Sequence, residues 1–171
     1  MRRTLRLFVL ACACGVLAIA ATNLTAAAQR QTPPTGNHPC SLLTAAEIEK
    51  AVGGKDPLDD RPPREEPWKL PSGQSGAECS FSVVTFQVDP YPWGTFEANA
   101  KSEGSKPLAG VGDAAYMTVK TSAPAMVGVA ARAGQHTLTV RVDLGRSPTQ
   151  TEEKARSAAI ALAQAIIAKL H

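Results

Sequence analysis

The chain has 171 residues, of which 44% are hydrophobic, and a formal net charge of +3. Its 18 Lys and Arg residues include Arg2, Arg3 and Arg6, whereas all 15 acidic residues lie after residue 28. Without residues 1–28 the protein would therefore be formally neutral. A neutral protein lacks the basic stripe that nucleic-acid binding requires, so we expect no nucleic-acid partner.

Residues 1–28 are organised like a secretory signal peptide. A basic start is followed by an apolar run over 7–21 and by the small-residue cleavage site Ala26–Ala28. We therefore expect an exported protein, periplasmic or extracellular, with no stable membrane anchor after cleavage. Two alternatives stay open: an uncleaved signal would tether the protein to the membrane, and Cys12, in a sequence similar to a lipoprotein cleavage box, would do so if it carried a lipid.

The rest of the chain has the size of one domain. Residues 29–38 are polar and Pro-rich, which indicates a flexible lead-in, and residues 39–171 are expected to form a single domain. Only two cysteines, Cys40 and Cys79, lie after the signal. In an exported chain they predict one disulfide, which is structural because the pair lacks the C-x-x-C spacing of redox sites.

A short helix is expected directly after Cys40. Thr44 followed three residues later by Glu47 has the spacing of a capping box, in which each residue's side chain bonds the other's backbone N–H. Ile48 supplies an apolar position, and Gly53 supplies a left-handed stop. This pattern predicts a helix of about Ala45 to Val52.

The middle of the chain begins with a Pro-rich stretch over residues 53–76, which we interpret as a long loop. Residues 78–88 then read as one strand. Both of its faces are apolar in part, so we expect a central strand or one with a bulge near Val83. Thr95 is the expected cap of a short helix that ends near Ser102.

Three further strands are expected after residue 114. The runs 116–121, 126–133 and 136–144 have β-type composition, and the last alternates apolar and polar residues most cleanly. Gly134 and Gln135 suit a two-residue hairpin between the last two runs. One face of this meander is apolar and the other is polar, which predicts a sheet covered on one side and wetter on the other.

The chain ends in its longest expected helix, with Ser147 or Thr149 as the capping residue. Its apolar stripe consists of Ala155, Ala159, Leu162 and Ile166. Together these elements predict an α+β fold: an antiparallel sheet of about four or five strands, packed by a short N-terminal and a long C-terminal helix, with one disulfide.

No motif of the chain identifies a chemistry. Gly110–Ala115 matches G-x-G-x-x-A, but a β-type run follows where the dinucleotide fingerprint needs a helix, so we expect a tight turn instead. The histidines His38, His136 and His171 are scattered, and no spare cysteine joins them in a metal cluster. His136 falls near a hairpin end, which favours a structural role. We therefore predict no catalytic, cofactor-binding or metal residues, no cofactor, and no enzyme activity.

Three aromatic residues, Trp68, Tyr91 and Trp93, fall in expected loops. Loop aromatics often form ligand platforms, and more often they plug the end of a small core. We predict that any surface for a partner or ligand lies at these three residues. Burial of the rings under the Pro-rich loop is the competing interpretation.

The segments Pro39–Ile48 and Gly110–Tyr116, with Cys79 opening a strand between them, resemble a family of small exported proteins and lipoproteins of unknown function, abundant in actinobacteria and found in other bacteria. The same features are similar to the extracellular sensor domain of mycobacterial membrane kinases. The resemblance covers residues 39–170 and brings no catalytic residues. It implies a non-catalytic envelope domain that binds a small ligand or an envelope protein. The alternatives are an exported hydrolase-like enzyme and a structural accessory of an envelope complex.

Overall fold

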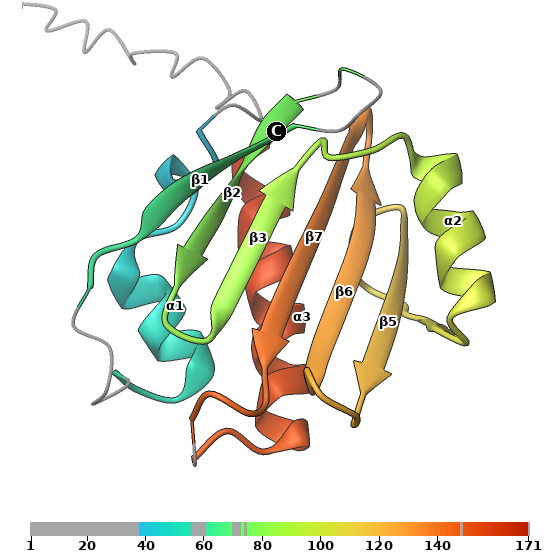
Figure 1. Cartoon of the computed structure of the whole chain (residues 1–171). Helices are drawn as coiled ribbons and strands as arrows, with labels where there is room; N and C mark the ends of the chain where they lie inside the picture. Colours follow the sequence, from blue (N-terminus) through green and yellow to red (C-terminus); the bar gives the residue numbers. More distant parts are fainter. Residues whose placement is uncertain (1–37, 56–60, 70–72, 74, 148, 171) are drawn as a thin grey trace, which may run out of the picture. The chain divides into compact units, whose positions relative to one another are not determined.

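The computed structural model describes residues 38–55, 61–69, 73, 75–147 and 149–170. The expected signal peptide, with Cys12, and nearly all of the expected lead-in lie outside these residues. The described part contains one antiparallel sheet of seven strands in the order β1-β2-β3-β7-β6-β5-β4 (Figure 1).

The elements follow one another in a simple order. In chain order they are a 3-10 turn (Pro39–Ser41), α1 (Ala45–Val52), β1 (Arg64–Lys69), β2 (Ser75–Phe81), β3 (Val84–Val88), α2 (Trp93–Ser102), β4 (Lys106–Pro107), β5 (Ala114–Lys120), β6 (Met126–Ala133), β7 (His136–Asp143) and α3 (Glu152–Lys169). The expected α+β class and antiparallel sheet are therefore confirmed.

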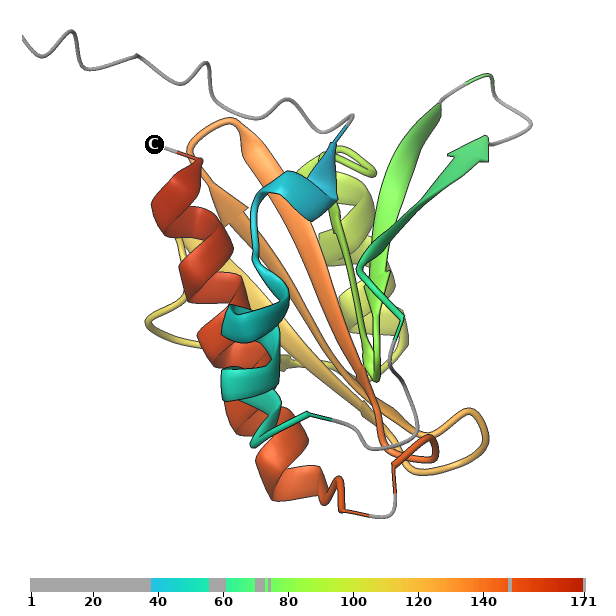
Figure 2. The same ribbon diagram turned by 90° about the vertical axis from the view of Figure 1, so that its left-hand side faces the viewer.

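Two helices cover one face of the sheet. Figure 2 shows α1 and α3 side by side on that face. The expected apolar stripe of α3 is confirmed, since Ala155, Ala159, Leu162 and Ile166 are each at most 1% exposed. Alanines in the stripe let the helix approach the strands closely, and the core between helix and sheet is filled by the inward residues of β3, β6 and β7.

The expected capping box of α1 is confirmed. The Thr44 N–H donates to the Glu47 carboxylate at 2.7 Å, and the Glu47 N–H donates to the Thr44 hydroxyl at 3.2 Å. Gly53 ends the helix with φ of 88°. Lys169 on α3 donates to the other Glu47 oxygen at 2.7 Å, so the start of one helix is tied to the end of the other.

The expected disulfide between Cys40 and Cys79 is also confirmed, with 5.0 Å between the Cα atoms. It joins the turn before α1 to the middle of β2. Glu65 on the neighbouring strand β1 supports the same turn, since its carboxylate accepts from the Cys40 N–H at 3.2 Å and lies 3.1 Å from His38 Nδ1. A disulfide of this kind indicates an oxidising, exported compartment.

The expectation of four or five strands is wrong, because residues 78–88 form two strands rather than one. β2 and β3 are a hairpin in which Phe81 pairs with Val84, so only Ser82 and Val83 form the turn. Ser82 adopts φ of 54°, a left-handed conformation for which glycine or asparagine is the usual residue. Without such a residue, the apolar run read as continuous.

Two more strands lie outside the segments that we expected to be strands. β1 falls inside the Pro-rich stretch 53–76 and pairs along its whole length with β2. β4, a strand of two residues, lies between α2 and β5. Both are edge strands, and each contains a proline, Pro67 or Pro107. Proline has no backbone N–H to donate, and it is tolerated at an edge because no further strand there needs that donor.

The helices differ from the expectation in number and in their starts. Three helices of the described part pack on the sheet, whereas the expected fold named only the N-terminal and C-terminal ones. The short helix expected after Thr95 is present as α2, but it begins at Trp93 with Pro92 before it. It lies on the face of the sheet opposite α1 and α3, where it contacts β5. The capping residue of α3 is Thr151, whose hydroxyl accepts from the Lys154 N–H at 3.3 Å, and neither Ser147 nor Thr149.

The glycine-rich segment 110–115 is the tight turn that we expected before β5. Gly112 has φ of 59°, and a Cβ at this position would collide with the carbonyl oxygen of Arg132. Asp113 follows, and its carboxylate accepts from the N–H of Gly134 at 2.7 Å, which ties this turn to the β6–β7 hairpin. In the described part of the chain, no helix has the length and apolar character needed to cross a membrane.

Candidate functional site

The face of the sheet opposite α1 and α3 carries mostly polar and small side chains. This follows from the strand period of two, because the alternate residues of β3, β7 and β6 fill the core. Thr85 pairs with Arg141, Arg141 with Gly128, and Gly128 with Thr118, so these four form one row across the open face. The neighbouring row is Gln87, Thr139, Ala130 and Tyr116.

A groove of about 360 Å³ lies between α2 and this open face. We call it the α2 groove. Its helix side is made by Tyr91, Phe96 and Asn99, and its sheet side by Tyr116 and Thr118 from β5, Gly128 and Ala130 from β6, and Thr139 and Arg141 from β7. The size lies within the range that small-molecule sites occupy in proteins.

Small residues on β6 keep the floor of the groove open. Gly128 does not have positive φ, and a Cβ built on it would meet its nearest neighbour, Met126, at 3.5 Å, which is an ordinary contact. The backbone therefore does not require glycine here. The missing side chain, together with the single methyl group of Ala130, leaves open space at the floor of the groove.

The three aromatic residues that we predicted as a binding surface come together beside the α2 groove. Trp68 lies on β1, Tyr91 in the turn before α2, and Trp93 at the first position of α2. The Trp68 and Tyr91 rings stack with centroids 6.2 Å apart. All three side chains are half-buried, so they are neither a fully exposed platform nor a buried plug, and their binding role stays a prediction.

Two further aromatic residues, which the sequence analysis did not single out, complete the series. The Tyr91 ring meets Phe96 edge-on at 5.7 Å, Phe96 lies 6.3 Å from Trp93, and Trp93 stacks on Tyr116 at 5.9 Å. The five rings thus run without a break from β1 to β5. Such contacts each add to the stability of the arrangement, so the helix side of the groove is held in place.

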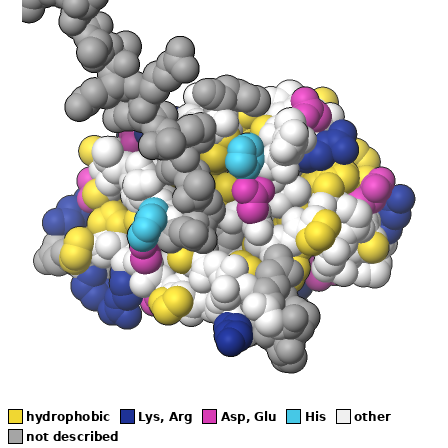
Figure 3. All heavy atoms as spheres, turned by 90° about the horizontal axis from the view of Figure 1, so that it is seen from above, with side chains coloured by type: hydrophobic (Ala, Val, Ile, Leu, Met, Phe, Trp, Pro, Cys, Tyr) yellow, Lys and Arg dark blue, Asp and Glu magenta, His cyan; other side chains and the backbone are white. Residues whose placement is uncertain are grey.

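The turn that carries Tyr91 is fastened to β7 by polar contacts. Asp89 has φ of 52° and accepts from the Thr137 N–H at 2.8 Å, while its second carboxylate oxygen lies 2.8 Å from His136 Nδ1. The Thr137 hydroxyl donates to the Tyr91 carbonyl at 2.8 Å. This agrees with the structural role expected for His136. Figure 3 shows histidine side chains beside acidic ones at this end of the domain.

Two arginines supply positive charge at the groove and next to it. Arg141 lies on the open face of β7, is exposed, and has no hydrogen-bond or ion-pair partner among the described residues. Arg132 lies over the ring of Trp93, with 5.8 Å between the guanidinium carbon and the ring centroid. A ligand in the groove would therefore meet apolar rings on one side and an available guanidinium on the other.

The residues of the groove that sequence reasoning missed share one signal. Arg141, Ala130 and Tyr116 occupy the polar-face positions of the strands that we expected, so strand alternation alone places them together on one face. That α2 covers this face is not visible in the sequence, because a short helix with few apolar residues pairs equally well with either side of a sheet.

Comparison with protein families, with curated proteins and with solved structures yields no match to this chain. Within the described ranges, no group of three or more His, Cys, Asp or Glu side chains is placed to hold a metal ion.

Proposed function

We propose that this protein is an exported domain that binds a small ligand in the α2 groove. The observation that carries the proposal is the groove itself. It combines a floor of small residues, a wall of packed aromatic rings and one unpaired guanidinium at about 360 Å³. Ligand sites in proteins typically have this composition, with apolar walls and a few polar groups that fix orientation.

The chemistry of the groove favours a ligand with a ring and an acidic group. The half-buried rings of Tyr91 and Tyr116 give flat apolar area. The hydroxyl of Thr139 and the guanidinium of Arg141 lie at the β7 side, where a carboxylate would receive charge-assisted hydrogen bonds. An aromatic or alicyclic carboxylate combines both requirements.

The supports of the groove indicate that it exists before the ligand arrives. The hydrogen bonds of Asp89 and the series of five rings fix the helix side of the groove. Preorganised sites lose less conformational freedom on binding, which favours affinity. The resemblance of the sequence to extracellular sensor domains is compatible with such a role, in which an external ligand is recognised without being converted.

Filling the groove tests the proposal. Ala130→Leu adds a bulky side chain to the floor, whereas Ala98→Leu makes the same change at an exposed position of α2 outside the groove. Binding of the probes benzoate and indole is followed by ligand-detected NMR. We expect both probes to bind the wild type and the Ala98→Leu variant, and to lose binding in Ala130→Leu.

Arg141→Gln separates the two parts of the ligand chemistry. We expect this variant to weaken benzoate binding while indole binding changes little, since only benzoate carries a charge. The proposal is refuted if the wild type binds neither probe, or if Ala130→Leu binds both as well as the wild type does. Thermal unfolding of each variant checks that the fold is retained.

A further inference from the structure

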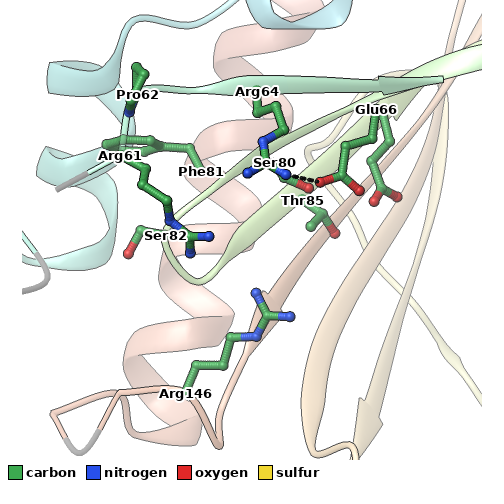
Figure 4. Close-up of a pocket in the computed structure, with 10 residues that line it drawn as sticks. Arg61, Pro62, Arg64, Glu66, Ser80, Phe81, Ser82, Thr85 and Arg146 are labelled. Atoms are coloured by element: carbon green, nitrogen blue, oxygen red, sulfur yellow. Dashed lines mark ion pairs between the residues drawn. The ribbon is translucent and has the colours of Figure 1, made fainter. Parts of the chain in front are cut away.

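A second hollow lies beside the α2 groove on the same face of the sheet. It measures about 500 Å³, and we call it the arginine pocket. Its charged residues are Arg61, Arg64, Arg146, Glu66 and Glu78. Figure 4 shows the guanidinium groups of Arg61, Arg64 and Arg146 directed toward the middle of the pocket, although Arg146 comes from the segment after β7.

Positive and negative residues of the pocket occupy different positions along β1 and β2. Arg64 on β1 pairs in register with Ser80 on β2, and the next pair on the same face is Glu66 with Glu78. Residues two apart along a strand are separated by about 7 Å. The side chains of Arg64 and Glu66 close part of this distance, since they pair at 3.5 Å. The two glutamates still lie at one end of the pocket, while Arg146 reaches it from the segment after β7, so a negative and a positive end can be distinguished.

The glutamate end is not neutralised by its neighbours. Glu66 and Glu78 face each other directly across adjacent strands, and like charges in this position repel. Glu78 accepts a hydrogen bond from the neutral amide of Gln87 at 2.7 Å. The ion pair of Glu66 with Arg64 is 3.5 Å long, and both side chains are more than half exposed. An exposed ion pair of this kind contributes little to stability. An added ammonium group between the two carboxylates would therefore be favoured, because it would relieve their repulsion.

We propose that the arginine pocket binds a short peptide through both of its charged ends. The carboxylate lies at Arg64 and Arg146, where it competes with Glu66 at 3.5 Å from Arg64 and with Asp143 at 3.1 Å from Arg146. The terminal ammonium lies between Glu66 and Glu78. Three positive and two negative side chains give the pocket a nearly balanced charge, which suits a zwitterion better than a polyanion. An extended chain rises about 3.3–3.6 Å per residue, so a separation of about 7 Å corresponds to a peptide of two or three residues.

Capped peptides test the proposal. The probes are trialanine with free ends, N-acetyl-trialanine and trialanine amide, measured by isothermal titration calorimetry against the whole domain. We expect trialanine to bind, and each cap to weaken binding about tenfold or more, because a charge-assisted hydrogen bond is lost in each case. Inorganic phosphate should bind more weakly than trialanine.

Two variants assign each peptide end to its residues. Glu78→Gln should abolish the difference between trialanine and its N-acetyl form, and Arg146→Gln the difference between trialanine and its amide. Glu153→Gln, an exposed change on the opposite side of the sheet, and Ala130→Leu, in the α2 groove, should leave trialanine binding unchanged. The use of Ala130→Leu separates this site from the proposed ligand site.

The proposal is overturned by any of three results. These are no binding of trialanine at millimolar concentration, equal binding of the free and capped peptides, or tighter binding of phosphate than of trialanine, which would make the pocket a simple anion site. Arg146 is exposed and Glu78 is half-buried, and Gln at position 78 can keep the contact with Gln87, so both variants are expected to unfold at temperatures close to that of the wild type. Circular dichroism checks this.

Discussion

Glu47 is the residue whose replacement tests the reasoning about stability most directly. Its carboxylate accepts from the N–H and the hydroxyl of Thr44 at 2.7 and 2.9 Å and from Lys169 at 2.7 Å. The contact with Lys169, followed by those with Thr44, lowers the pKa of this carboxyl from 4.5 to about 2. Glu47→Gln keeps the shape of the side chain and removes its charge.

The expected loss of stability is about 1–2 kcal/mol. A pKa lowered from 4.5 to about 2 corresponds to about 3 kcal/mol if solvent screening is ignored. The side chains of Lys169 and Glu47 are 40% and 42% exposed, so screening reduces this figure substantially. Loss of a helix cap alone typically costs about 1 kcal/mol. For a domain of this size the melting temperature should fall by about 3–8 °C.

The contribution of Glu47 to the free energy of unfolding should depend on pH, in a direction that its lowered pKa determines. Because the pKa is lower in the folded state, the stabilisation is complete above pH 4.5 and is lost as the pH falls toward 2. Urea unfolding of wild type and Glu47→Gln at pH 7 and near pH 2 measures this. The difference in unfolding free energy should be largest at pH 7 and close to zero near pH 2.

Glu49→Gln, one turn away from the helix start, is the matched control and should change stability little. Lys169→Met allows a double-mutant cycle, in which the pair with Glu47 should show a coupling of about 0.5–1 kcal/mol. The reasoning is refuted if Glu47→Gln is as stable as the wild type at pH 7, or if the difference between them does not shrink in acid.

The remaining predictions concern the core, the disulfide and one turn. Leu162→Ala should destabilise the protein by about 2–4 kcal/mol in urea unfolding, and a loss below about half a kcal/mol would mean that the helix packs differently. The purified oxidised protein should show no free thiol from Cys40 or Cys79 in a thiol titration without reductant, and two titratable thiols would disprove the bond. Gly112→Ala should cost about 2 kcal/mol or more, because its φ of 59° and the Arg132 carbonyl exclude a Cβ, whereas Gly94→Ala, with open space around it, should be nearly neutral.

Features set by neighbouring residues were predictable from the sequence. The capping box of Thr44 and Glu47 involves one helical turn, and Gly134 specifies a hairpin by its own conformation. The stripe that contains Leu162 follows from helical periodicity. The disulfide is not local, but only two cysteines remain outside the expected signal peptide, so one pairing was possible.

Features in which a residue adopts a backbone conformation or a secondary structure that its type does not favour were not predictable. Ser82 adopts a left-handed conformation that its side chain does not favour, which hid the β2–β3 turn. β1 is a strand because β2 offers it a partner along its whole length, although five of its six residues are exposed. Its sequence therefore lacks the apolar alternation by which strands are recognised.

The candidate site was predictable only in part. Trp68, Tyr91 and Trp93 were selected because large rings in loops need an explanation, and the structure brings them together beside the groove. The groove itself depends on the side of the sheet on which α2 lies. On that side Phe96 and Ala100 are buried and α2 contacts β5, a contact between residues distant in the sequence.

The prolines of the outermost strands have a consequence for the association of the protein with copies of itself. An exported domain folds among many copies of itself, and an open strand edge is a template on which a second copy can add its own strand. Pro67 at one edge and Pro107 at the other interrupt the row of N–H donors that such an addition needs. The described sheet is therefore protected at both of its edges against the addition of further strands.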